Sequence, residues 1–213
     1  MNGTGDRADF ASDGRPRNPF ATRYTRPGAI PPLDTGGRPL DLESLAKALS
    51  AAGAAALQGA HGHGKTTLLV ALADTLAAAG RRVRVLRMRG VREAWEAVVA
   101  LAVEPAETAV FVDGWERLGV GGRALAALAR HRRGPLLVTA HAPVGLPVLR
   151  HCTTSVAMLR AIVARLPDHG GLIDDDDVAR AFHRHGGDLR ESLADLYDRV
   201  EGRRAAGPKA RPA

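Results

Sequence analysis

The sequence has little of several features that mark whole classes of proteins. It has one cysteine, Cys152, in 213 residues, which excludes an intrachain disulfide and suits a reducing compartment. No apolar run is long enough to span a bilayer, and the polar start MNGTGDRADF lacks the apolar region of a signal peptide. Aromatic residues make up only 4% of the chain, so a core drawn from its 45% apolar content must consist mainly of Ala, Leu and Val. We therefore expect a soluble cytoplasmic protein with one core, a small appendage at most, and no membrane partner.

The net charge of +7 is concentrated at the two ends of the chain. Residues 1–38 carry six Arg and four Asp, and residues 202–213 carry four Arg or Lys and no acid. Little net charge is left for residues 39–201, which argues against a large nucleic-acid-binding face. A basic tail adds a weak, salt-sensitive attraction to nucleic acid, so nucleic acid is only a weakly supported partner.

Strand and helix patterns alternate through the middle of the chain. Short runs of apolar and β-branched residues predict strands at 54–58, 82–87, 108–113, 135–140 and 153–158. Helical spacing of apolar residues predicts helices at 40–53, 65–79, 91–103 and 116–130. This alternation predicts a three-layer α/β/α fold with a parallel five-stranded sheet. The charges of Arg82 and its neighbours suit a strand at the edge of that sheet.

The chain divides into four parts by composition. We expect an extended or disordered N-terminal segment at 1–38, a core at 39–158, a small helical lid at 159–202 and a disordered basic tail at 203–213. Within the first part, Asn18 to Leu33 mixes aromatic and apolar residues with prolines, and is expected to lie against a domain surface. The acidic run Asp174 to Asp177 is best explained as the first turn of a helix, and less well as a metal site.

The stretch GAHGHGKTT fulfils the pattern GxxxxGK(S/T). It lies between a predicted strand and a predicted helix, which is the context that a phosphate-binding P-loop requires. Glycines let successive backbone N–H groups point at a polyphosphate, and the following helix directs its positive end at the same charge. Lys65 can reach the β- and γ-phosphates, and the Thr66 hydroxyl can ligate Mg²⁺. The predicted nucleotide-binding residues are Gly59, Ala60, His61, Gly62, His63, Gly64, Lys65, Thr66 and Thr67.

Two further features refine this prediction. His61 and His63 have no nearby Cys or carboxylate set, so we expect them to line the loop and not to bind a metal. No guanine-specifying motif lies in the expected place, which favours ATP. Asp113 ends the apolar run AVFVD at the carboxyl end of a strand, where it can hold Mg²⁺ together with Thr66. Glu116 follows shortly after, either as the base that activates water or as an ordinary residue of a first helical turn.

The glycine loop, the extra strand before Asp113 and the stretch GGDLRESL together resemble the AAA+ branch of P-loop NTPases, of the clamp-loader and origin-recognition type. The resemblance covers about Leu40 to Glu201. It implies that the second strand lies at the sheet edge, that Thr139 (with His141 as second choice) senses the γ-phosphate, and that Arg190 reaches over the nucleotide from the lid. Arg150 in LRHC is either an arginine finger or a surface arginine. The family places a Glu directly after the magnesium Asp, where this chain has Gly114.

The chain is also similar to short, uncharacterised bacterial P-loop proteins that share the motifs NPF…RPGAIP, VDG-aromatic-E and LLVTAH. The AAA+ resemblance, in which the segment before the first strand borders the adenine, implies that Phe20 to Ile30 do so here. The sequence therefore predicts a Mg²⁺-dependent, ATP-binding protein, an AAA+-like ATPase that drives a conformational change on a protein partner or a second copy of itself. Two alternatives stay open: a nucleotide-dependent switch with little turnover, which Gly114 favours, and a small-molecule kinase.

Overall fold

The computed structural model describes residues 17–88, 107–118 and 134–206, with single positions between 90 and 122. Most of the expected helix at 91–103, and most of the expected helix at 116–130 beyond Leu118, lies outside the described residues. So do the first 16 residues and the tail from residue 207.

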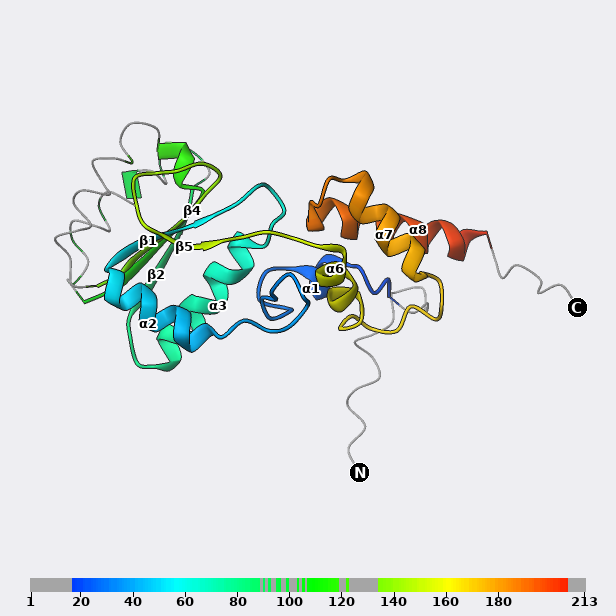
Figure 1. The fold of residues 1–213 in the computed structure, drawn as a ribbon, viewed down its shortest axis with the longest axis horizontal. Coiled ribbons are helices and arrows are strands. Elements are labelled where there is room, and N and C mark those ends of the chain that lie inside the picture. Colours follow the sequence, from blue (N-terminus) through cyan, green and yellow to red (C-terminus); the bar gives the residue numbers. More distant parts are fainter. Residues whose placement is uncertain are drawn as a thin grey trace, which may run out of the picture.

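The strands form one parallel five-stranded sheet, which lies in one half of the molecule (Figure 1). Its strands are β1 (Ala54–Gln58), β2 (Val83–Arg87), β3 (Ala109–Asp113), β4 (Leu136–Ala140) and β5 (Val148–His151). Their order is β2-β3-β4-β1-β5, and every pairing is parallel. The predicted α/β class and parallel sheet are confirmed, and β2 lies at the edge as expected. Because β4 lies between β1 and β3, the carboxyl ends of these three strands are neighbours.

The predicted strand over Thr153–Met158 is wrong. The fifth strand is Val148–His151, which pairs with β1, and Val156–Val163 forms helix α6. The Ser155 side chain explains the change, because it accepts a hydrogen bond from the Met158 N–H at 3.0 Å and caps the helix. The β-branched residues that suggested a strand therefore lead out of the sheet into a helix.

Alternating residues of the strands build two apolar layers on opposite faces of the sheet. On one face, α2 (Leu42–Ala52) and α3 (Lys65–Ala78) pack against Ala55, Leu57, Phe111 and Leu137. The other face carries Ala56, Val110, Val112 and Val138, packed with Trp115 from the short 3₁₀ helix η1 (Trp115–Leu118) and with Leu146. The sheet is thus flanked by helices, compatible with the three-layer arrangement.

A separate group of helices, here called the helical part, follows β5. It comprises α6, α7 (Asp175–Arg184) and α8 (Leu189–Ala205), which Figure 1 shows gathered to one side of the sheet. The acidic run is explained as predicted, since Asp174 and Asp177 form a capping box at the start of α7. None of the described helices has both the length and the apolar character required to cross a membrane.

The N-terminal segment packs onto this helical part. It contains the single-turn helix α1 (Thr22–Thr25), and its Phe20 and Leu33 are buried in the same apolar cluster as Leu159 and Leu196. The Asn18 side-chain amide donates to the Tyr197 carbonyl at 3.0 Å. The expectation that this segment lies against a domain surface is confirmed, and the surface is that of α6–α8.

Candidate functional site

The carboxyl ends of β1, β3 and β4 open into a cleft of about 1310 Å³ between the sheet and the helical part. Ligands of open parallel sheets gather at this end, outside the strands. The residues predicted from the sequence that line the cleft are His61, Gly62, His63, Gly64, Lys65, Thr66, Thr67, Asp113, Glu116, Thr139, His141, Arg150 and Arg190. The structure therefore brings together side chains that lie more than a hundred residues apart.

Two glycines of the loop are required by the local structure. Gly64 has a φ of 75°, in the left-handed region, and directly precedes α3. Gly59 is required for a different reason: an added Cβ would lie 2.3 Å from the Cys152 carbonyl oxygen. The His63 ring also contacts this oxygen, through Nδ1 at 3.1 Å. The loop is thus fitted against the segment that follows β5.

The Lys65 ammonium group lies inside the glycine loop. The residue is only 8% exposed, and its Nζ donates to the carbonyl oxygens of Gly59 at 2.8 Å and Ala60 at 2.7 Å. Burial lowers the pKa of Lys65, and nearby carboxylates oppose that shift. The carboxylates that face it are those of Glu116, Asp113 and Asp188. An ammonium group is therefore held by two loop carbonyls, with three carboxylates near enough to affect its pKa.

Asp113, Thr66 and Thr139 meet through hydrogen bonds beside this cation. The Thr66 hydroxyl lies 3.1 Å from Asp113 Oδ2, and the Thr139 hydroxyl donates to Asp113 Oδ1 at 2.7 Å. Thr139 also accepts a hydrogen bond from the Gly114 N–H at 2.8 Å. Asp113 ends β3, Thr139 lies near the end of β4, and Thr66 lies in the first turn of α3, which follows the loop after β1, so the sheet topology creates the cluster.

The oxygens of Thr66 and Asp113 fit a magnesium ion. Mg²⁺ prefers hard oxygen ligands and usually takes one or two carboxylates, keeping several waters and binding substrate phosphates. A hydroxyl and a carboxylate 3.1 Å apart match that donor set. A full protein cage for another metal is not present in the described ranges, where no group of three or more His, Cys, Asp or Glu could hold an ion.

A second polar group borders the cluster. His141 Nδ1 lies 2.9 Å from Glu116 Oε1, and the rings of His141 and His61 are 3.7 Å apart at their centroids, inclined by 61°. Burial lowers the pKa of His141, and the charge of Lys65 adds to the effect while Glu116 opposes it. The sequence placed His141 second to Thr139 as a sensor and left the role of Glu116 open, but it did not predict that they pair.

The start of α8 lies on the glycine loop. Asp188 caps α8 by accepting from the Arg190 N–H at 2.9 Å and the Glu191 N–H at 3.1 Å. The Leu189 N–H donates to the Gly62 carbonyl at 3.3 Å, and a Cβ at Gly62 would lie 1.8 Å from Asp188 Oδ1. The Arg190 side chain is exposed on the cleft. Sequence reasoning missed this contact between Asp188 and the loop, although the glycine at position 62 was a signal that something approaches it closely.

Arg150 and the N-terminal segment complete the cleft wall. Arg150 lies on β5, opposite Leu57 of β1. Its side chain belongs to the wall of the same cleft as Lys65 of its own chain. Phe20, Arg26 and Ile30 line the cleft from the other side. The segment expected to border the adenine is therefore in reach of the cleft, together with apolar residues of α6 and α8.

Comparison of the chain with protein-family models and with curated proteins gives no match. The distinctive content of the cleft is a cation inside a glycine loop, a carboxylate tied to two hydroxyls, and an arginine on the facing helix.

Proposed function

We propose that the chain is a Mg²⁺-dependent ATP-binding protein, a P-loop NTPase of the AAA+-like branch that hydrolyses ATP. One observation carries the proposal: Thr66, Asp113 and Thr139 converge by hydrogen bonds of 2.7 to 3.2 Å next to the buried Lys65. A chance glycine turn would not require a carboxylate and a hydroxyl from two other strands at its side. Phosphate binding with a divalent cation uses a strand-end carboxylate beside the loop hydroxyl, and the Thr139 hydroxyl holds that carboxylate in place.

In this proposal each residue has a chemical task. Backbone N–H groups of the glycine loop and the start of α3 bind the phosphates, and Lys65 exchanges its two carbonyl partners for phosphate oxygens. Thr66 and Asp113 hold Mg²⁺, which neutralises charge on the phosphates when bound. Thr139 orients Asp113. Phe20 to Ile30 and the apolar residues of the helical part enclose the adenine.

The helical part acts as a lid in this proposal. Arg190 extends from the start of α8, whose Leu189 already contacts Gly62 of the loop. A γ-phosphate would attract Arg190 and draw α8 closer, and its release would let α8 retreat. Hydrolysis would thereby change the angle between sheet and lid, which a protein partner or a second copy of the chain could sense.

One observation favours a second candidate, a nucleotide-dependent switch with little turnover. The position after Asp113 is Gly114, with a φ of 90°, so this position carries no carboxylate to activate water. Such a protein would still bind ATP and move its lid. Steady-state ATPase measurements separate the two candidates, since only the first forms ADP continuously.

Isothermal calorimetry with ATP and Mg²⁺ tests the binding itself. We expect the wild type to bind, and Lys65→Ala to lose at least about tenfold in affinity, because a charge-assisted contact to phosphate is worth about 1.5–3 kcal/mol. Lys47→Ala is the matched control, since Lys47 is exposed on α2 away from the cleft. Absence of heat with the wild type, for both ATP and GTP, would rule the proposal out.

A further inference from the structure

Three side chains from three separate segments form a contact group that the proposed function does not yet use. His61 lies in the glycine loop, Glu116 in η1 after β3, and His141 directly after β4. The ring of His141 touches both of the others, through the 2.9 Å contact to Glu116 and the 3.7 Å ring contact to His61. All three line the cleft beside Lys65 and Asp113.

The backbone around Gly114 places Glu116 in this group. Gly114 has a φ of 90°, a conformation that glycine adopts at no steric cost. Trp115 is then buried in the core on one face of the sheet and fixes η1 there. Glu116 follows with its side chain 38% exposed, toward the cleft. The chain thus has no carboxylate at position 114, directly after Asp113. It has one two positions further on, at Glu116, and this carboxylate pairs with His141.

We propose that His141 is the general base of ATP hydrolysis and that Glu116 is a positioning residue that orients its ring. The inference rests on the proposed function. A carboxylate accepts hydrogen bonds, so the 2.9 Å contact requires the proton of neutral His141 to be on Nδ1. Nε2 then keeps its lone pair for a water proton. His61 packs against the same ring and limits its rotation.

The electrostatics of the group suit this role. A good general base has a pKa near the working pH, which imidazole meets better than a carboxylate does. Burial is the main cause that lowers the pKa of His141, and the charges of Lys65 and of His61, when protonated, lower it further, while Glu116 raises it. The imidazole is therefore neutral at pH 7. Its tautomer is set by Glu116, as in other catalytic pairs in which an acid orients a histidine.

The hydrolytic step balances with these groups. The oxygen of water forms a bond to the γ-phosphorus while the bond from that phosphorus to the β–γ bridging oxygen breaks. The bridging oxygen leaves on ADP with the bonding electron pair, and the transferred group becomes inorganic phosphate. One proton of the water moves to Nε2 of His141, which returns it to solvent through the open cleft.

Single-turnover ATP hydrolysis by the full chain tests the assignment, with ATP affinity measured in parallel by calorimetry. We expect His141→Gln to bind ATP and to lose about 10²–10⁴-fold in rate, the range for a general base. Glu116→Gln should lose less of the hydrolysis rate than His141→Gln does. Its pH–rate profile should keep its shape but shift its midpoint to lower pH, because the anion that raises the His141 pKa is gone. The wild-type rate should hold at pH 6.5, the ordinary pKa of histidine, and should fall only as the pH drops through the lowered pKa of His141.

His151→Gln is the matched control, because His151 is exposed on β5 and does not line the cleft. Its rate and pH profile should equal those of the wild type. If Glu116→Gln abolishes turnover while His141→Gln retains it, Glu116 is the base and the inference is overturned. If the wild type binds ATP without hydrolysing it, the inference fails while the proposed binding function stands. If the wild type does not bind ATP, both fail.

Discussion

The Thr139 hydroxyl has two partners and holds one of the two proposed cation ligands, Asp113. It donates to Asp113 Oδ1 at 2.7 Å and accepts from the Gly114 N–H at 2.8 Å. The residue is 2% exposed, so water cannot easily replace either bond. A single hydroxyl thus fixes the orientation of the carboxylate and the left-handed turn that leads to Glu116.

We expect Thr139→Val to keep the fold and to weaken the site. The substitution keeps the shape of the side chain but leaves the Gly114 N–H without a partner, at a cost of about 1–3 kcal/mol in the free energy of unfolding. The freed Asp113 should also bind Mg²⁺·ATP less tightly. Urea unfolding and calorimetry measure the two effects.

Thr75→Val is the control for this substitution. Thr75 lies on α3 and donates to the Ala71 carbonyl within its own helix, so its loss removes a hydroxyl without touching the cleft. Equal ATP affinities for the two variants would contradict the role given to Thr139.

Residues whose chemistry depends on local pattern could be found in the sequence. The loop residues from Gly59 to Thr67 and the strand-ending Asp113 were identifiable because spacing alone defines them, and the structure brings them together. The contact of Asp188 with the loop and the pairing of His141 with Glu116 could not be identified in this way, since each joins segments that are far apart in the sequence. No periodicity in a single chain reports which strand ends become neighbours.

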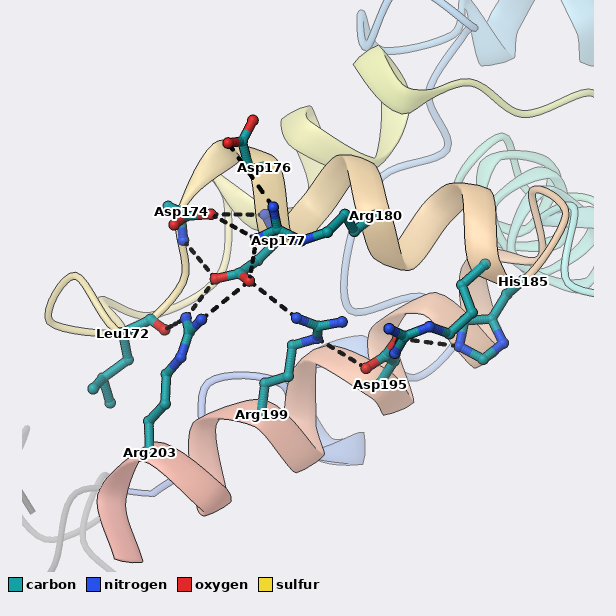
Figure 2. Close-up of polar contacts among 10 residues, drawn as sticks. Leu172, Asp174, Asp176, Asp177, Arg180, His185, Asp195, Arg199 and Arg203 are labelled. Carbon is teal, nitrogen blue, oxygen red and sulfur yellow. Dashed lines mark hydrogen bonds and ion pairs between the residues drawn. The ribbon is translucent and has the colours of Figure 1, made fainter. Parts of the chain in front are cut away.

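At the scale of elements, α7 and α8 are joined by a buried carboxylate (Figure 2). The Asp177 side chain has no exposed surface, and it accepts hydrogen bonds from Arg180 at 2.8 Å, Arg199 at 3.0 Å, and Arg203. Arg199 continues the network to Asp195 at 2.9 Å. Burial opposes ionisation of Asp177, but the hydrogen bonds from Arg203 and Arg180 outweigh it and hold the pKa of this carboxyl well below its ordinary value.

We expect Asp177→Asn to destabilise the helical part by about 2–3 kcal/mol, somewhat less than is usual for a broken buried pair, because its arginine partners can regain water. A lowered folded-state pKa stabilises the fold above the unfolded pKa of about 3.9. The loss caused by Asp177→Asn should therefore be complete at pH 7 and unchanged down to about pH 4, and should vanish only as the pH falls through the folded-state pKa. Thermal unfolding of the wild type and of Asp177→Asn from pH 7 to pH 2 measures this loss of stability and its dependence on pH.

Asp176→Asn supplies the comparison on the same turn of α7. The Asp176 side chain is 84% exposed and lies 3.9 Å from Arg180, so its loss should change the free energy of unfolding by less than about 0.5 kcal/mol. A cost for Asp177→Asn no greater than that of Asp176→Asn would show that the network contributes nothing measurable.

The elements themselves were predictable where a single physical preference decides them. Continuous apolar runs identified β1, β3 and β4, which are buried on both faces. The strand β5 escaped notice because its residues are exposed or half-buried and the run VLRH resembles no buried strand. The β-branched residues that follow β5 suggested a strand. They lead into helix α6 instead, because the Ser155 side chain caps that helix.

At the scale of the whole molecule, the cleft separates two units that touch at few described points. The Leu189 N–H contacts Gly62, and the Thr154 hydroxyl donates to the Gly187 carbonyl at 2.8 Å. The N-terminal segment packs onto the helical part and lines the cleft. A nucleotide in the cleft would add contacts to both units at once, so its binding should make their unfolding more cooperative.

A nucleotide in this bridging position should stabilise both units. ATP with Mg²⁺ at a hundredfold excess over its Kd should stabilise the wild type by about 2.7 kcal/mol, and should slow amide hydrogen exchange in α3 and α8 alike. Arg190→Ala should weaken binding about tenfold, since a charged hydrogen bond contributes about 1.5–3 kcal/mol. At saturating ATP the variant should still protect α3, where the phosphate loop lies, but no longer α8.

Arg165→Ala is the control, because Arg165 is an exposed arginine of the helical part away from the cleft. This variant should behave as the wild type. Equal protection of α8 in the Arg190→Ala protein would mean that the lid is drawn to the nucleotide by something other than this arginine.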